Sequence, residues 1–240
     1  MKVIICDNYE KMSLEAARIF AAQIIIKPNC ILGLATGSTP VGMYNYLSDM
    51  YKKRELDFSD VTTFNLDEYY PIEHSNDQSY HYFMNENLFS KINVSAENIH
   101  IPDGSSANPE EECKKYEESI SKAGGIDLQI LGIGQNGHIG FNEPATVLDP
   151  ETHVTDLTEN TIESNSRFFE SKDLVPTKAL TMGIGSIMKA KKILLLASGK
   201  SKQDIVKKLL ESGIDTNIPA TMLKAHPDVT LICDKDAYGA

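Results

Sequence analysis

Residues 128–144 read LQILGIGQNGHIGFNEP, and this stretch indicates both the fold class and the place of the functional site. Its first four residues form an apolar run that predicts a buried strand. Four glycines follow within the next thirteen residues, so the chain after the strand can wrap closely around a ligand. The same segment contains His138, and a carboxylate such as Glu143 can fix a histidine's tautomer and strengthen it as a base. The stretch therefore predicts acid–base chemistry on a small molecule.

The loop also contains the G-x-G-x-x-G spacing of dinucleotide-binding proteins, at Gly132, Gly134 and Gly137. That fingerprint requires a helix that begins at the third glycine and an acid at the end of the next strand. Here the chain continues to Pro144, which is a poor start for a long helix, and His138 stands where a packed helix needs a small or apolar residue. We therefore expect no nucleotide cofactor.

The composition indicates a soluble globular protein with one domain over residues 1–240. Hydrophobic residues make up 41% of the chain and charged residues 24%, and no Pro/Gly/Ser-rich linker divides it. The net charge of -11 disfavours a nucleic-acid or anionic-membrane partner. We find neither an apolar stretch of membrane-spanning length nor a signal peptide. The cysteines are scattered without a C-x-x-C pair, which is typical of reduced thiols in the cytoplasm: Cys6, Cys30, Cys113 and Cys233.

Short apolar runs alternate with helical patterns along the chain. Strands are expected at residues 3–6, 30–35, 61–66, 128–133, 179–182, 192–197 and 229–233, and helices at about 13–26, 40–54, 79–89, 108–123 and 201–211. This alternation predicts an α/β protein with a Rossmann-like, mainly parallel sheet and helices on both faces. Ligands of such sheets bind beyond the carboxyl ends of the strands, so the loops at those ends should form the site.

The expected strand at residues 30–35 leads into a turn of small residues, Thr36-Gly37-Ser38-Thr39-Pro40. Thr39 as N-cap and Pro40 at the first helical position are signals for a helix start. Free backbone N–H groups, the positive end of the helix dipole and the hydroxyls make a phosphate cradle. The alternative is a capped turn with no ligand. A P-loop lysine is missing, which argues against a nucleoside triphosphate.

Two acids, Asp67 and Glu68, follow the strand expected at residues 61–66. Most acidic pairs are solvated loop residues, and that is the alternative here. At the carboxyl end of a buried strand, however, a half-buried Asp67 with a moderately raised pKa can act as a general base.

Asn136, His138 and Glu143 form the third candidate group. A single histidine is more often structural than catalytic, but the glycine-rich setting and the nearby carboxylate favour acid–base chemistry. The sequence has no H-E-x-x-H motif or second nearby histidine, so we expect no metal.

Three cationic residues are candidates for completing an anion site. Arg167 lies in the segment NSRFF at residues 165–169, and Lys200 and Lys202 flank a predicted strand-to-helix turn. A surface cation by itself is usually solvated. Together with the turn at residues 37–39, these cations fit a phosphate group.

Four segments taken together resemble the glucosamine-6-phosphate deaminase (isomerase) family: LATGSTP at 34–40, FNLDEY at 64–69, residues 132–144 and NSRFF at 165–169. The similarity runs in order along nearly the whole chain. It implies a Rossmann-like fold and the conversion of glucosamine 6-phosphate and water into fructose 6-phosphate and ammonia, in the catabolism of amino sugars such as N-acetylglucosamine. It also implies no metal or organic cofactor, no nucleic-acid or membrane partner, a cytoplasmic location, and a monomer or homo-oligomer.

The resemblance also implies roles for individual residues. The family's general base falls on Asp67, and its ring-opening group falls on Asn136, His138 and Glu143. Its phosphate ligands fall on Gly37, Ser38, Thr39, Arg167 and Lys202, with Lys200 as the alternative lysine. Some members carry aspartate where this chain has Asn136. Asparagine can orient a histidine by hydrogen bonding but supplies no negative charge.

Two alternative functions remain. A 6-phosphogluconolactonase has a related fold and a similar glycine–histidine loop, but it does not need a base such as Asp67 to remove a carbon-bound hydrogen. The FNEP sequence at residues 141–144 also favours the deaminase. A non-catalytic sugar-phosphate sensor would carry a DNA-binding module, and we expect none because the first strand is predicted at residue 3.

Overall fold

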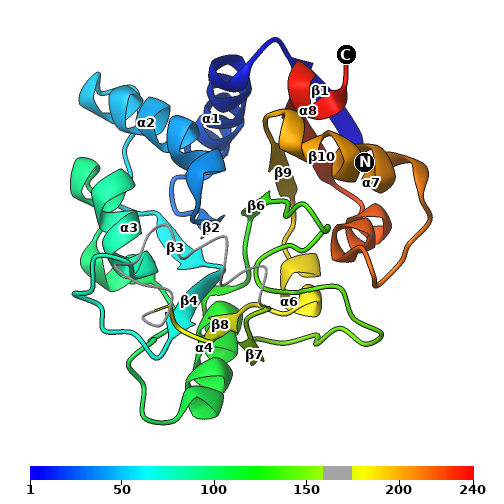
Figure 1. The fold of residues 1–240 in the computed structure, drawn as a ribbon. Coiled ribbons are helices and arrows are strands. Elements are labelled where there is room, and N and C mark those ends of the chain that lie inside the picture. Colours follow the sequence, from blue (N-terminus) through cyan, green and yellow to red (C-terminus); the bar gives the residue numbers. More distant parts are fainter. Residues whose placement is uncertain (159–174) are drawn as a thin grey trace.

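The computed structural model of the protein describes residues 1–158 and 175–240. Its centre is a seven-stranded parallel sheet with the strand order β1-β10-β9-β6-β2-β3-β5 (Figure 1). The strands are β1 (Lys2–Cys6), β2 (Ile31–Leu34), β3 (Thr62–Asn65), β5 (Ile99–His100), β6 (Leu128–Gly132), β9 (Ile193–Ala197) and β10 (Val229–Asp234). The central strands β2 and β9 are buried at every position, as expected for strands covered on both faces. The predicted α/β fold is confirmed.

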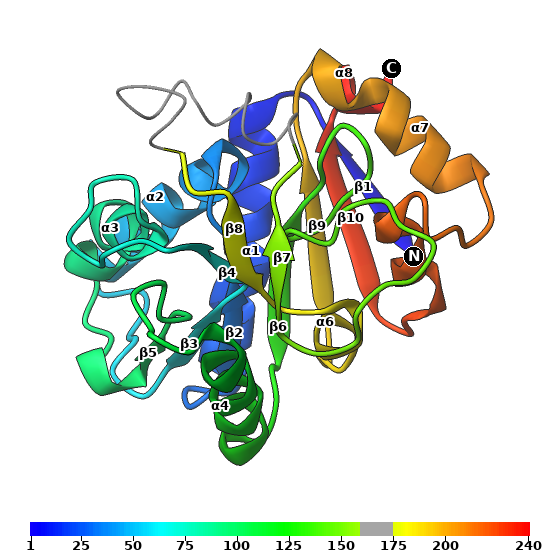
Figure 2. The same ribbon diagram turned by 60° about the horizontal axis from the view of Figure 1, so that its bottom comes forward.

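Helices cover both faces of this sheet. Figure 2 shows α1 (Tyr9–Ile26) behind the sheet and α4 (Pro109–Ala123) in front of it, and α2 (Ser38–Lys52) packs beside α1. The other helices among the described residues are α3 (Tyr80–Asn87), α6 (Ile184–Met188), α7 (Gln203–Glu211) and α8 (Lys235–Tyr238), with 3-10 helices η1 (Phe89–Lys91), η2 (Ala96–Asn98), η4 (Lys200–Lys202) and η5 (Pro219–Ala225). On α1 the fully buried side chains Met12, Ala16 and Phe20 recur every four residues, so they share the face that packs into the core.

Two helix starts differ from those expected. Helix α1 begins four residues earlier than residue 13, because the Asn8 side chain accepts a hydrogen bond from the Lys11 N–H at 2.9 Å and caps it. In α2 the N-cap is Gly37 and not Thr39, so the first helical residue is Ser38 and the predicted cap was wrong. The φ angle of Gly37 is 90°, a conformation that favours glycine, and glycine has no side chain with which to cap the helix.

A second, antiparallel sheet has the order β4-β8-β7 and is not predicted by the sequence pattern. Its strands are β4 (Asp67–Tyr70), β7 (His153–Asp156) and β8 (Lys178–Thr181). The strand expected at 179–182 therefore exists, but it belongs to this small sheet and not to the parallel one. Leu66 alone separates β3 from β4. Its N–H donates to Leu34 O of the parallel sheet at 2.9 Å, and its carbonyl oxygen accepts from the N–H of Met182, just after β8, at 2.8 Å. Asp67 consequently opens a strand, where a loop was expected.

The four cysteines are free thiols in the structure, as expected from their spacing. No helix among the described residues has the length and apolar character needed to cross a membrane.

Candidate active site

The predicted site residues gather at one edge of the parallel sheet. Strands β9, β6, β2 and β3 are neighbours in that order, and the site segments follow their carboxyl ends. Residues 198–202 follow β9, the glycine-rich loop follows β6, the turn at 36–40 follows β2, and Asp67 comes just after β3. Because the carboxyl ends of parallel strands meet at one edge, segments far apart in the sequence converge there.

Asp67 is the first residue of β4, where it pairs with Thr181 of β8. It is 6% exposed, so it is more deeply buried than the sequence suggested. Burial, with a further contribution from the negative charge of Glu68, raises the pKa of Asp67 to about 8. The raise is larger than the moderate one expected. A carboxyl group whose pKa lies near neutral pH suits general base catalysis.

The glycine-rich loop joins Asn136, His138 and Glu143 in one network. The His138 Nδ1 atom lies 3.4 Å from Glu143 Oε1. Asn136 donates to Glu143 Oε2 at 2.6 Å and accepts from the His138 backbone N–H at 3.1 Å. Asn136 therefore holds both the carboxylate and the backbone of the histidine, and the carboxylate faces the imidazole ring.

Glycines give this loop its shape. A Cβ atom added at Gly134 would lie 2.3 Å from His138 Cε1, so the histidine ring occupies the space that any other residue would fill. The Gly134 N–H donates to His138 O at 2.9 Å, and Gly137, with a φ of 90°, accepts from the Ala220 N–H at 2.9 Å. The loop does not turn into a helix at Gly137, which agrees with the rejection of the dinucleotide fingerprint.

The same loop passes next to Asp67. A Cβ atom added at Gly140 would lie 3.5 Å from Asp67 Oδ2 and 2.9 Å from Thr181 Oγ1. The Phe141 N–H donates to Thr181 Oγ1 at 3.1 Å. Thr181 thus pairs with Asp67 across the small sheet and also fixes the loop. Sequence reasoning missed it, because a threonine at the end of an apolar run is ordinary.

The turn after β2 lines an open pocket of about 370 Å³, formed by Tyr9, Ser38, Thr39, Val41 and Ser198. The Tyr9 hydroxyl holds the turn, since it donates to Ser38 O at 3.0 Å and accepts from the Gly42 N–H at 2.8 Å. No side chain caps α2, so its first N–H groups and its dipole are available to an anion. Tyr9 is a further pocket residue that the sequence did not indicate, whereas Ser198 opens the predicted turn that carries Lys200 and Lys202.

The two candidate lysines differ in burial. Lys200 is exposed, whereas Lys202 is partly buried and desolvation lowers the pKa of its ammonium group. A partly desolvated cation gains more from an anionic ligand than an exposed one does, so the structure favours Lys202. Arg167 lies outside the described residues.

The described residues therefore place a buried carboxyl group, a histidine–carboxylate pair and an open pocket at the start of α2 along the same edge of the sheet. They contain no cluster of three His, Cys, Asp or Glu side chains able to hold a metal ion. This arrangement suits proton transfers on a small phosphorylated molecule.

Comparison with known proteins gives consistent matches. Residues 9–232 match the family described as glucosamine-6-phosphate isomerases/6-phosphogluconolactonase. The chain is 61% identical over 237 residues to the glucosamine-6-phosphate deaminase of Thermoanaerobacter pseudethanolicus, covering 99% of this chain and 94% of that protein. It is 58% identical to the deaminase of Clostridium botulinum (strain Loch Maree), covering 99% of this chain and 97% of that protein.

Solved structures show the same relationship. A monomeric glucosamine-6-phosphate deaminase superposes with a TM-score of 0.97 at 47% identity, covering 100% of this chain and 99% of that one. A 6-phosphogluconolactonase from Thermotoga maritima superposes with a TM-score of 0.76 at 23% identity, covering 98% and 99% of the two chains. The second match shows the shared fold alone.

Proposed function

This chain belongs to the family of glucosamine-6-phosphate isomerases and 6-phosphogluconolactonases, and we propose that within it the chain is a glucosamine-6-phosphate deaminase. The reaction converts glucosamine 6-phosphate and water into fructose 6-phosphate and ammonia. The observation that carries the assignment is the position of the buried Asp67 next to the His138 loop. Burial raises the pKa of Asp67 to about 8, so its ionised form is a stronger base than an ordinary carboxylate. Relatives at 61% and 47% identity that bear this activity support the same choice.

The first step is opening of the sugar ring, because C2 becomes acidic only in the aldehyde form. His138 takes the proton of the anomeric hydroxyl and returns one to the ring oxygen. Glu143, 3.4 Å from the imidazole, stabilises the positive charge that the ring gains in between. Asn136 holds this carboxylate in place, and as a neutral amide it adds no charge of its own.

The second step is the transfer of a hydrogen between carbons. Asp67 removes the proton from C2 of the aldehyde while the C1 oxygen takes up a proton, which gives an enolamine. Asp67 then delivers its proton to C1, and water attacks C2 of the resulting ketose iminium ion. The C–N bond then breaks and ammonia leaves, so the deaminase is also a hydrolase acting on a C–N bond. Positioned acid–base groups suffice for each proton transfer, without a metal or an organic cofactor.

The phosphate group holds the substrate in position for both steps. We place it at the start of α2, against the backbone N–H groups and hydroxyls of Gly37, Ser38 and Thr39. Lys202 and Arg167 supply the positive charge that a phosphate dianion needs. The enzyme would act in cytoplasmic amino-sugar catabolism, including that of N-acetylglucosamine, as one domain over residues 1–240.

The test is to assay the purified protein with two substrates. Ammonia release from glucosamine 6-phosphate supports the deaminase, and hydrolysis of 6-phosphogluconolactone without ammonia release would support the lactonase. A protein that binds glucosamine 6-phosphate but turns over neither compound would be a sensor. The matched control is Asp67→Asn, which should bind the substrate but release almost no ammonia.

A further inference from the structure

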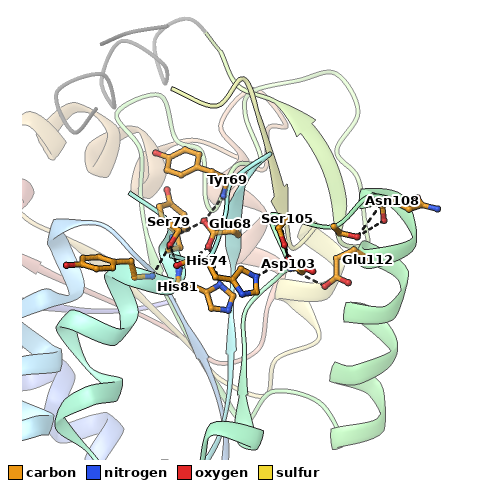
Figure 3. A network of polar contacts seen from close by, with 12 residues as sticks. Glu68, Tyr69, His74, Ser79, His81, Asp103, Ser105, Asn108 and Glu112 are labelled. Atoms are coloured by element: carbon orange, nitrogen blue, oxygen red, sulfur yellow. Dashed lines mark hydrogen bonds and ion pairs between the residues drawn. The ribbon is translucent and has the colours of Figure 1, made fainter. Parts of the chain in front are cut away.

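The residue next to the proposed base is also a buried acid. Neighbouring residues on a strand point to opposite faces, so Glu68 lies behind Asp67 and not beside it. Glu68 is fully buried. Its Oε1 atom accepts from the N–H groups of Tyr69 at 2.9 Å and Tyr80 at 2.8 Å, and its Oε2 atom accepts from the His81 N–H at 3.0 Å (Figure 3).

These contacts attach the start of helix α3 to strand β4. Ser79 caps α3 by accepting from the Tyr82 N–H at 3.0 Å. Glu68 takes the N–H groups of the first two helical residues, which would otherwise lack partners, and its charge faces the positive end of the helix dipole. The loop at Gly104 closes over it, since a Cβ atom there would lie 3.0 Å from Glu68 Cγ. Substrate therefore does not reach Glu68.

The helix start carries Tyr80, which touches three parts of the site. Its ring lies 4.8 Å from that of Tyr69, and it stacks on Phe141 of the glycine-rich loop at 6.2 Å. Its hydroxyl interacts with the side chain of Thr36 in the turn after β2, which acts to lower the pKa of Tyr80. Burial raises the pKa of Tyr80 well above its ordinary value, so this hydroxyl stays protonated at neutral pH. A contact that holds Tyr80 in place therefore also holds β4, the turn at residues 36–40 and the glycine-rich loop relative to one another.

The charged and titratable groups around Glu68 come from β4, α3, the turn between them and the loop after β5. On β4 its neighbour is Asp67, whose pKa its negative charge helps to raise. On α3 the His81 Nδ1 atom lies 3.4 Å from Glu68 Oε2. His81 stacks on His74, in the turn between β4 and α3, with the ring centroids 3.8 Å apart. His74 Nε2 in turn lies 2.9 Å from Asp103, in the loop after β5 (Figure 3). The histidines and Asp103 are partly exposed, so Glu68 is the buried end of this chain of contacts.

We propose that Glu68 is a positioning residue of the deamination reaction: it anchors α3 and Tyr80 to the strand of the base, and it places a fixed negative charge behind Asp67. The reaction named here rests on the proposed function, whereas the anchoring and the charge are properties of the protein alone. Both roles act through other residues, because Glu68 faces away from the substrate. Glu68→Asp tests the anchoring role at constant charge, whereas Glu68→Gln removes the charge together with one of the two oxygens that accept backbone N–H groups.

Two substitutions test the roles. Glu68→Gln keeps the length but removes the charge and one acceptor oxygen, so kcat should fall and, in addition, the acid limb of the pH profile of kcat/KM should move down by roughly one pH unit. Glu68→Asp keeps the charge but withdraws the carboxylate from α3, so kcat should fall roughly tenfold while the acid limb stays in place. Glu73→Gln removes the charge of an exposed acid on the same segment and should change neither quantity.

A second measurement does not depend on any reaction. Protein labelled with carbon-13 at the aspartate carboxyl groups reports the ionisation of Asp67 by NMR, with the resonance assigned through its absence in Asp67→Asn. A downward shift of this titration in Glu68→Gln supports the proposal even if glucosamine 6-phosphate is not the substrate. An unchanged Asp67 titration in Glu68→Gln, or a parental kcat in Glu68→Asp, would overturn the corresponding role. If Glu68→Gln does not fold, Glu68→Asp alone decides the anchoring role.

Discussion

Two buried aspartates stand at opposite edges of the parallel sheet, and they are treated in opposite ways. At the amino edge Asp127, just before β6, accepts from Lys27 Nζ and Lys191 Nζ at 2.7 Å each and from the Ile31 N–H at 2.8 Å. Burial acts to raise the pKa of Asp127, but the hydrogen bonds from the two lysines and the backbone outweigh it and lower the pKa. At the carboxyl edge, burial and Glu68 raise the pKa of Asp67 to about 8.

The difference separates a structural charge from a functional one. The amino edge carries its own counter-charges, so Asp127 is neutralised without a ligand. The carboxyl edge gives Asp67 a negative neighbour, and its candidate cation Lys202 forms no ion pair with a carboxylate among the described residues. Asp127 therefore adds to stability in its ionised form, whereas ionising Asp67 costs stability. Ionisable groups whose charged form reduces the stability of the ligand-free protein are typical of catalytic sites.

Asp67→Asn should have the largest effect of all the changes considered. It removes the base but keeps the shape of the side chain, so kcat for ammonia release should fall by roughly 10²–10⁴-fold. Substrate binding, measured by calorimetry, should remain. Near-parental turnover would place the base elsewhere and end the contrast with Asp127.

Lys27 and Lys191 bind a carboxylate of the protein itself at the amino edge. Arg167→Ala tests whether Arg167 instead binds the phosphate group of the substrate. Arginine binds phosphate through paired, charge-assisted hydrogen bonds, so its loss should weaken the preference for glucosamine 6-phosphate over glucosamine by roughly 10–100-fold. The ratio of kcat/KM for the two sugars measures this. If the ratio is unchanged, the phosphate binds at another place.

Asp127→Asn should act on stability and leave the chemistry alone. The pKa of Asp127 is lowered in the folded state, so its contribution is present above its ordinary value of 3.8 and is lost as the pH falls through the folded value. At pH 7 the substitution should reduce the free energy of unfolding by about 1–2 kcal/mol. Urea denaturation measures the loss, and kcat should stay parental. Asp49→Asn, at an exposed ion pair, is the matched control and should change little.

The last expected effect also concerns stability, and it has the opposite sign. Because the pKa of Asp67 is raised, the folded protein holds a proton that the unfolded chain releases near pH 4, and this stabilisation is lost as the pH rises to about 8. Asp67→Asn should flatten that decline, so at pH 9 the free energy of unfolding should be higher in the variant than in the parent. Denaturation curves from pH 5 to pH 9 check the sign. A variant that is less stable than the parent at pH 9 would contradict it.

Patterns of local sequence predicted the parallel sheet and the segments that gather at the carboxyl ends of its strands. A few consecutive residues are enough to predict some features, because apolar residue types determine burial and glycines determine loop conformation. The apolar runs of β2, β6 and β9 and the glycines around His138 are examples. Asn136 and Glu143 were also predictable from local sequence, because they lie seven residues apart in the same loop. In the structure their side chains are hydrogen-bonded at 2.6 Å.

Features that depend on tertiary contacts could not be predicted in this way. Strand β4 has the sequence DEYY, and a segment that begins with two acids is not predicted as a buried strand. The two acids are buried only because a loop and a helix cover them in the folded protein. Glu68 finds its partners twelve and thirteen residues further along, at the start of α3. Tyr9 and Thr181 are ordinary residue types whose roles arise only from what folding brings near them.

The central claim is that Asp67 removes the hydrogen from C2 of the sugar. The most direct test is to follow the C2 hydrogen of glucosamine 6-phosphate by NMR, with the parent protein and with Asp67→Asn in heavy water. We predict that the parent removes this hydrogen and that the variant does so roughly 10²–10⁴-fold more slowly, in step with its loss of ammonia release. Removal of the C2 hydrogen by Asp67→Asn at the parental rate would contradict the claim.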